Sequence, residues 1–148
     1  MIKENSAKSN KYFTAALIIA LCCSGKLVAQ VHHWEKLVGE SDLWKYRVGN
    51  SEPAFDWMSP SFNDAGWQAA SGGIGYGDGD DQTIIANCSS LYMRRSFTIS
   101  QKQDIEALIF HGDYDDGFVA YLNGFEIARG NIDTVTPPFN YSPVQWRE

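Results

Sequence analysis

Apolar and polar side chains alternate along several short segments of the chain, and no segment of useful length has the spacing of an amphipathic helix. In 43–48 three apolar residues alternate with two basic ones, which predicts a strand with one face on a core. The same pattern in 91–99 places Arg95 on the apolar face, where its stem is expected to pack while its guanidinium reaches a carboxylate. The nearly continuous apolar run 105–110 predicts a strand covered on both faces.

The clearest local signal lies in 118–129, where two apolar-rich segments flank Asn123-Gly124. Asn-Gly is the preferred pair for a two-residue type I′ turn, because both central residues need a positive φ. We therefore expect strands over 118–122 and 125–129 joined by a tight turn. Gly124 is expected to be the more constrained of the two turn residues, because Asn tolerates the left-handed region better than other side chains do.

Long turn-rich connections separate these segments. The stretches 50–67 and 71–90 are rich in Gly, Pro, Asn and Asp, and three prolines follow Gly130. Short strands, long loops and no helices predict an all-β sandwich or barrel. A complete sandwich of this kind has about seven or eight strands, and fewer can be placed here. We therefore expect a domain that lacks its last strand, which leaves room for further domains beyond Glu148.

Residues 1–30 have the three-part pattern of a secretory signal peptide. Three lysines precede the apolar run 13–23, and a polar stretch then leads to Gln30. The run is shorter than the roughly 20 apolar residues needed to span a bilayer, so a membrane anchor is disfavoured. We expect cleavage near Gln30 and a secreted domain over 31–148, located outside the cell, at its surface or in the periplasm.

Removing 1–30 makes the domain strongly acidic. Four of the twelve basic residues and one of the eighteen acidic residues lie in that segment, which leaves eight against seventeen and a formal net charge of −9. Such a surface repels phosphate backbones and anionic membranes, so we expect neither as a partner. Neutral sugars and divalent cations stay open.

The chain carries no pattern typical of a catalytic site. Two of the three cysteines lie in 1–30, which leaves Cys88 without an internal disulfide partner and without a basic neighbour to lower its pKa. The histidines have no metal-ligand spacing. Adjacent carboxylates such as Asp115 and Asp116 point in different directions and do not make an acid–base pair. The sequence therefore predicts a domain that is not an enzyme.

Three aspartates follow a glycine-rich run and form a candidate structural Ca²⁺ site: Asp78, Asp80 and Asp81. They supply hard oxygen ligands on a flexible loop, which Ca²⁺ tolerates. A phosphate-binding loop is excluded, because no Lys or Ser/Thr follows at the required spacing and the aspartates repel phosphate. The alternative is a solvated acidic turn without an ion.

Several aromatic residues lie in or beside loops rather than inside the expected strands. Exposed rings at the mouth of a sandwich stack on sugar faces while neighbouring polar side chains bond hydroxyls. An inward position that caps the core is favoured for Trp67, whereas both positions stay open for Tyr76. The acids of 111–117 are expected first of all to organise the loop before the hairpin. The candidate ligand-binding residues are Trp57, Tyr76, Tyr114, Asp115, Asp116 and Arg129.

Five pieces of the sequence, taken in chain order, resemble one known pattern. They are 44–46 (WKY), 62–67 (FNDAGW), 73–77 (GIGYG), 92–97 (YMRRSF) and 115–129 (DDGFVAYLNGFEIAR). Their order resembles the galactose-binding-like domains of large secreted bacterial proteins, in particular those with a CotH-like kinase domain or a lamin-tail domain. A looser similarity extends to the sugar-binding domain of β-galactosidase-type glycoside hydrolases.

The resemblance covers about 43–131 and implies a jelly-roll β-sandwich, an accessory role and often a bound Ca²⁺. Together with the loop aromatics it predicts a non-catalytic module that binds a carbohydrate or another neutral ligand at a cell surface. Two alternatives stay open. One is the N-terminal part of a larger enzyme, either a glycoside hydrolase or a CotH-like kinase, and the other is a structural or adhesion spacer. Sugar binding follows here from the fold and not from a recognised site.

Overall fold

The computed structural model describes residues 33–77 and 79–143, so the expected signal peptide and Asp78 lie outside the described residues. The described residues from Lys36 onward belong to one compact unit. Strands supply nearly all of their regular structure, and their one helical element is the short 3₁₀ turn η1 (Lys102–Asp104). The all-β character predicted from the sequence is confirmed. In this part of the chain no helix is long and apolar enough to cross a membrane.

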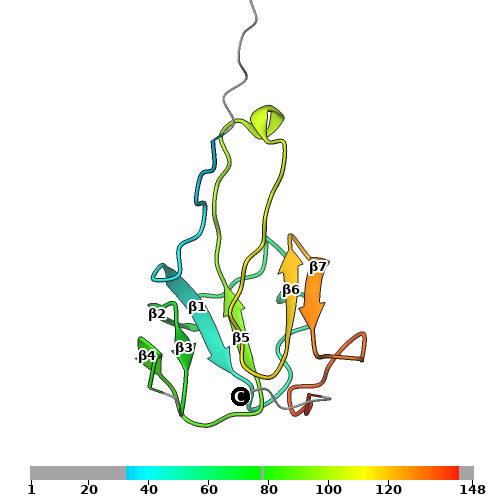
Figure 1. Ribbon diagram of the computed structural model, residues 1–148. Helices are drawn as coiled ribbons and strands as arrows, with labels where there is room; N and C mark the ends of the chain where they lie inside the picture. The colour runs from blue at the N-terminus through cyan, green and yellow to red at the C-terminus, as the bar shows by residue number, and fades with distance from the viewer. Residues whose placement is uncertain (1–32, 78, 144–148) are drawn as a thin grey trace, which may run out of the picture. The chain divides into compact units, whose positions relative to one another are not determined.

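A three-stranded antiparallel sheet has the order β2-β1-β5 (Figure 1). β1 (Leu43–Val48) has the bounds predicted from its alternating pattern, and β2 (Gln68–Ser71) and β5 (Leu91–Arg94) flank it. β2 pairs with the first four residues of β1, whereas β5 pairs with the last four. Arg47 and Val48 therefore have a partner strand on one side only.

The connection between β2 and β5 contains a small parallel pair, β3 (Ile74–Gly75) and β4 (Thr83–Ile84). Thr83 anchors this pair to the main sheet, because its Oγ1 donates a hydrogen bond to the carbonyl of Ser71 at 3.0 Å. The two short strands bring together the ends of the loop that is rich in Gly and Asp. That loop is therefore held at its base by backbone hydrogen bonds.

The predicted hairpin is confirmed. β6 (Phe118–Leu122) pairs with β7 (Phe125–Gly130), and Leu122 lies opposite Phe125, which leaves a two-residue turn. Asn123 has φ 52° and Gly124 has φ 86°, as the Asn-Gly pair predicts. The register shifts between Ala120 and Tyr121, so the hairpin carries one irregularity in its ladder.

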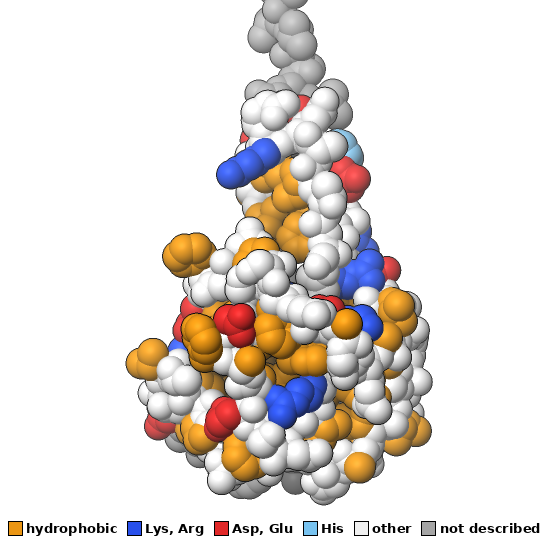
Figure 2. Space-filling model, turned by 180° about the vertical axis from the view of Figure 1, so that it is seen from behind, with side chains coloured by type: hydrophobic (Ala, Val, Ile, Leu, Met, Phe, Trp, Pro, Cys, Tyr) orange, Lys and Arg blue, Asp and Glu red, His pale blue; other side chains and the backbone are white. Residues whose placement is uncertain are grey.

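An aromatic cluster takes the place of a fully buried core, since none of the described hydrophobic side chains is fully buried. Trp57 lies at its centre, with ring centroids 6.2 Å from Trp67, 5.2 Å from Tyr92 and 5.8 Å from Tyr121. Because Tyr92 belongs to β5 and Tyr121 to β6, the cluster joins the sheet to the hairpin. Figure 2 shows hydrophobic side chains exposed over much of one face.

One strand prediction is confirmed only in part, and another is wrong. The strand expected over 91–99 ends at Arg94, and 105–110 forms no strand and is exposed, with Ile109 69% accessible. Figure 1 shows the chain leaving the sheet after β5, reaching η1 and returning to β6. An apolar run becomes a strand only where a neighbouring strand accepts its backbone hydrogen bonds, and no described strand does so here. Arg95 does reach a carboxylate as predicted, with Nη2 3.1 Å from Asp42 Oδ2.

Candidate functional site

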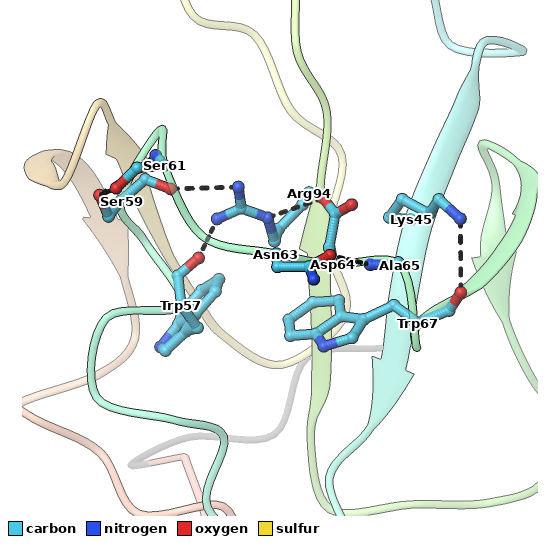
Figure 3. A network of polar contacts seen from close by, with 9 residues as sticks. All are labelled: Lys45, Trp57, Ser59, Ser61, Asn63, Asp64, Ala65, Trp67 and Arg94. Atoms are coloured by element: carbon cyan, nitrogen blue, oxygen red, sulfur yellow. Dashed lines mark hydrogen bonds and ion pairs between the residues drawn. The ribbon is translucent and has the colours of Figure 1, made fainter.

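Arg94, on β5, is the centre of a polar network that fixes the loop before β2 (Figure 3). Its Nε lies 3.1 Å from Asp64 Oδ2, and its two Nη atoms donate to the carbonyls of Trp57 and Ser59. The guanidinium also lies over the ring of Phe62 at 5.0 Å. With 12% of its side chain exposed and these three acceptors engaged, Arg94 acts as a structural anchor and not as a ligand contact.

The same loop ends in a tight turn that positions Trp67. Trp67 N–H donates to the carbonyl of Asp64 at 2.9 Å, and Ala65 N–H donates to Asn63 Oδ1 at 3.0 Å. The ring then packs against Phe62, with centroids 5.7 Å apart, as well as against Trp57. Trp67 is half-buried, so one part of the indole contacts the cluster while the remainder reaches the surface.

An open hollow of about 690 Å³ lies beside Trp67, next to the start of β2, where β1 continues past its pairing with β2. We call it the Trp67 hollow. Ring edges and polar side chains from three segments line it, with Gly66, Val48 and Ala86 completing the wall. The aromatic and polar lining residues are Tyr46, Arg47, Asn50, Asn63, Trp67, Gln68 and Asn87. Such a surface offers amide donors and acceptors beside apolar ring area, which is the combination that hydroxyl-rich ligands require.

A smaller hollow of about 250 Å³ lies at the other end of β1, and its charged groups are already engaged. Arg94 and Arg95 pair there with Asp64 and Asp42, and Lys45 Nζ donates to the carbonyl of Trp67 at 3.5 Å. The exception among the described residues is the buried Nε of Arg95, which has no hydrogen-bond partner. This hollow therefore has less polar capacity for a ligand than the Trp67 hollow.

Two of the predicted ligand-binding aromatics have distinct surroundings. Trp57 lies at the centre of the aromatic cluster, where three other rings contact it and leave it half-buried. Tyr76 is 41% exposed and follows β3, and its hydroxyl donates to the carbonyl of Cys88 at 3.1 Å. Tyr76 thus remains accessible to a ligand, whereas Trp57 contributes to packing.

Burial raises the pKa of the Cys88 thiol above its ordinary value, which disfavours the thiolate.

The predicted residues Tyr114, Asp115 and Asp116 lie together in the loop before the hairpin. The Tyr114 ring packs on Phe118 with centroids 4.4 Å apart, and Asp115 Oδ1 accepts the backbone N–H of Asp116 at 2.9 Å. Asn131 Nδ2 donates to the carbonyl of Asp116, which has φ 59°, at 2.7 Å. The acids organise this loop as predicted, and Asp115 is the exposed member of the three.

Arg129, the sixth predicted ligand residue, holds the chain that follows the hairpin. Its guanidinium forms a two-point pair with Glu126, at 2.5 and 2.6 Å, and donates to the carbonyl of Thr134 at 2.7 Å. The bond from Arg129 lowers the pKa of the Glu126 carboxyl below its ordinary value. The three predicted aromatics have different neighbours: Trp57 packs on Trp67, Tyr92 and Tyr121, Tyr76 bonds the carbonyl of Cys88, and Tyr114 packs on Phe118.

The candidate Ca²⁺ ligands lie in the loop between β3 and β4. Asp80 is exposed, and the Asp81 carboxylate packs against the backbone of Gly75, where an added Cβ would lie 2.5 Å from Oδ1. Among the residues that the structure describes, no three His, Cys, Asp or Glu side chains are grouped to hold a metal. Asp78, the third expected ligand, lies outside those residues.

The described residues thus form an all-β domain whose Trp67 hollow is lined by side-chain amides and aromatic rings. Comparison of the chain with protein-family models, with characterised proteins and with solved structures found no match. The Trp67 hollow was not predicted from the sequence. Its signal is an asparagine in each of three loops, Asn50, Asn63 and Asn87, and only the folded chain brings them together.

Proposed function

We propose that the chain is a secreted, non-catalytic accessory module that binds a carbohydrate in the Trp67 hollow. The observation that carries the proposal is the lining itself. Four side-chain amides, from Asn50, Asn63, Gln68 and Asn87, lie around an open floor beside the Trp67 ring. An amide presents one acceptor and two donors, which matches the paired donors and acceptors of sugar hydroxyls, and an exposed aromatic ring covers the apolar face of a pyranose.

The proposal includes a galactose-binding-like jelly-roll fold. In support, the antiparallel sheet β2-β1-β5 and the antiparallel hairpin β6-β7 pack through one aromatic cluster, as the facing sheets of a sandwich do. Residues from the sequence segments that carry the resemblance also stabilise the fold, which supports the same proposal. The Asp64 turn and Arg94 fix one loop, and Asn123-Gly124 closes the hairpin.

Secretion and a structural Ca²⁺ ion belong to the same proposal. The signal-peptide pattern of 1–30 supports export. Closure of the loop between β3 and β4 by backbone bonds supports a Ca²⁺ ion at Asp78, Asp80 and Asp81, because a pre-closed loop loses less entropy when it binds an ion. Tyr76 and Asp115, the exposed members of the predicted ligand set, are proposed as outer contacts for a longer glycan.

The test is retardation of the purified protein on affinity gels that contain different polysaccharides. Asn87→Ala removes a lining amide that makes no hydrogen bond to the rest of the described chain, and we expect it to weaken binding about fivefold, as for the loss of one hydrogen bond. Asn140→Ala, an exposed asparagine outside the hollow, is the matched control and should bind normally. A folded protein that no polysaccharide retards would contradict the proposal.

A further inference from the structure

We infer that the carbohydrate bound in the Trp67 hollow carries a carboxylate, as a uronic acid does, and that Arg47 binds this group. The inference rests on the proposed function and names the chemical class of its ligand. The observation behind it is which arginines already have a carboxylate partner within the described residues. Three of the four arginines in the described residues are paired with a carboxylate: Arg94 with Asp64, Arg95 with Asp42 and Arg129 with Glu126.

Arg47 is the exception. Within the described chain it has no ion-pair partner, and its Nη2 donates one hydrogen bond, to the hydroxyl of Ser51 at 2.7 Å. Arg47 is also the arginine that lines the Trp67 hollow. It stands on the half of β1 that pairs with β5 alone, beside the segment where β2 begins. The guanidinium therefore keeps most of its five donors for a ligand.

The rest of the lining carries no charge. Its polar side chains are amides and one phenol, so an anion that enters the hollow meets one cation and no carboxylate. Glu52, close to Arg47 in sequence, does not line the hollow, and its Oε1 accepts the backbone N–H of Phe139 at 2.9 Å. A planar guanidinium binds a carboxylate through two parallel hydrogen bonds, and such bonds are stronger than those to a neutral hydroxyl.

The acidic composition of the chain limits the ligand further. The formal net charge of −9 in 31–148 repels a dense polyanion, but screening confines that repulsion to about 8 Å at physiological ionic strength. A single carboxylate in direct contact with Arg47 is attracted more strongly than distant charges repel it. The ring edges and amides of the hollow need hydroxyls and an apolar sugar face as well. We therefore expect an oligosaccharide with one or two uronic acid residues.

The experiment compares matched disaccharides that differ only in a carboxylate or a hydroxymethyl group at C6. Galacturonic, glucuronic and mannuronic acid disaccharides are titrated against the full chain by calorimetry at about 0.15 M salt, each beside its galactose, glucose or mannose counterpart. For at least one pair we expect the acid to bind tenfold or more tightly than the neutral sugar. Arg47→Gln should remove this preference, and Arg47→Lys, which keeps the charge without the planar fork, should retain part of it.

Lys102→Gln is the charge-matched control. Lys102 is an exposed residue of η1 outside the hollow, and its loss changes the net charge by the same amount as Arg47→Gln. It should leave the preference intact. Equal binding of every acid and its neutral counterpart, or a preference that survives Arg47→Gln, overturns the inference while the proposed function stands. A folded protein that binds none of the six sugars overturns the inference, and the polysaccharide gels then decide the proposed function separately.

Discussion

Replacing Arg94 by methionine tests whether the loop before β2 is held by its polar network. Methionine keeps the unbranched stem and removes the guanidinium. Asp64 then loses its ion pair, the carbonyls of Trp57 and Ser59 lose a donor, and Phe62 loses the cation above its ring. Arg94 is the side chain on which these contacts converge (Figure 3).

The size of the effect follows from the exposure of the groups left behind. Breaking one side of a buried ion pair costs about 3–5 kcal/mol, because the remaining charge stays unpaired in a poorly solvated site. Asp64 is 29% exposed, so water restores part of its solvation and the cost falls to the lower end of that range. We expect Arg94→Met to lower the free energy of unfolding by about 3 kcal/mol, a large part of the 5–15 kcal/mol typical of a domain.

Urea denaturation followed by tryptophan fluorescence measures this change, because Trp57 and Trp67 border the network. Arg47→Gln is the matched control. It removes an arginine of the same sheet that has no ion pair with any described residue, and it should change stability by less than about 0.5 kcal/mol. Arg94→Lys keeps the charge but not the fork and should fall between the two. A midpoint shift for Arg94→Met no larger than that of Arg47→Gln would refute the reasoning.

Three further predictions concern the hairpin, an ion pair and the expected metal. Gly124→Val should destabilise the fold by about 1 kcal/mol or more in thermal unfolding, because valine is strained at the positive φ of this position even though an added Cβ meets no close neighbour. Asn123→Gly should leave the melting temperature nearly unchanged. Equal melting temperatures for the two variants would contradict this prediction. Arg129 lowers the pKa of Glu126, so their pair stabilises the fold above the ordinary value of 4.5 and is lost as the pH falls through the lowered pKa. Glu126→Gln should therefore melt below wild type at pH 7 and coincide with it near pH 2, and a constant difference would argue against the pair. If the loop 77–81 binds Ca²⁺, excess chelator should lower the melting temperature, and an unchanged curve with and without Ca²⁺ would exclude the ion.

The sequence predicted best the elements whose geometry is decided locally. The alternation in β1 and the Asn-Gly pair of the hairpin each specify a backbone conformation within a few residues, and both elements have the expected bounds apart from Gly130, which extends β7. The strand prediction for 105–110 failed because strand formation also depends on a neighbouring segment. Its composition favours a strand, but the outcome depends on whether another segment lies beside it. Composition alone carries no information about that neighbour.

The candidate site was harder to predict for a related reason. The Trp67 hollow combines the end of β1, the turn before β2 and the loop before β5, and none of these segments has a motif of its own. The predicted set was chosen because its aromatics lie in loops, yet Trp57 packs against three other rings and is half-buried. A large ring in a loop buries as much apolar area as one in a strand, so in a small domain it packs against other rings.

The residues that carry the resemblance and those that line the hollow have different tasks. Asp64 and Arg94 use their polar atoms on each other and on backbone carbonyls, and Asn123-Gly124 uses its φ angles to reverse the chain. These residues stabilise the fold, so their presence does not indicate which ligand the domain binds. Arg47 and Asn87 contribute little to the fold and face the hollow. Substitutions at the first group should therefore change stability, and substitutions at the second group should change the ligand without changing stability.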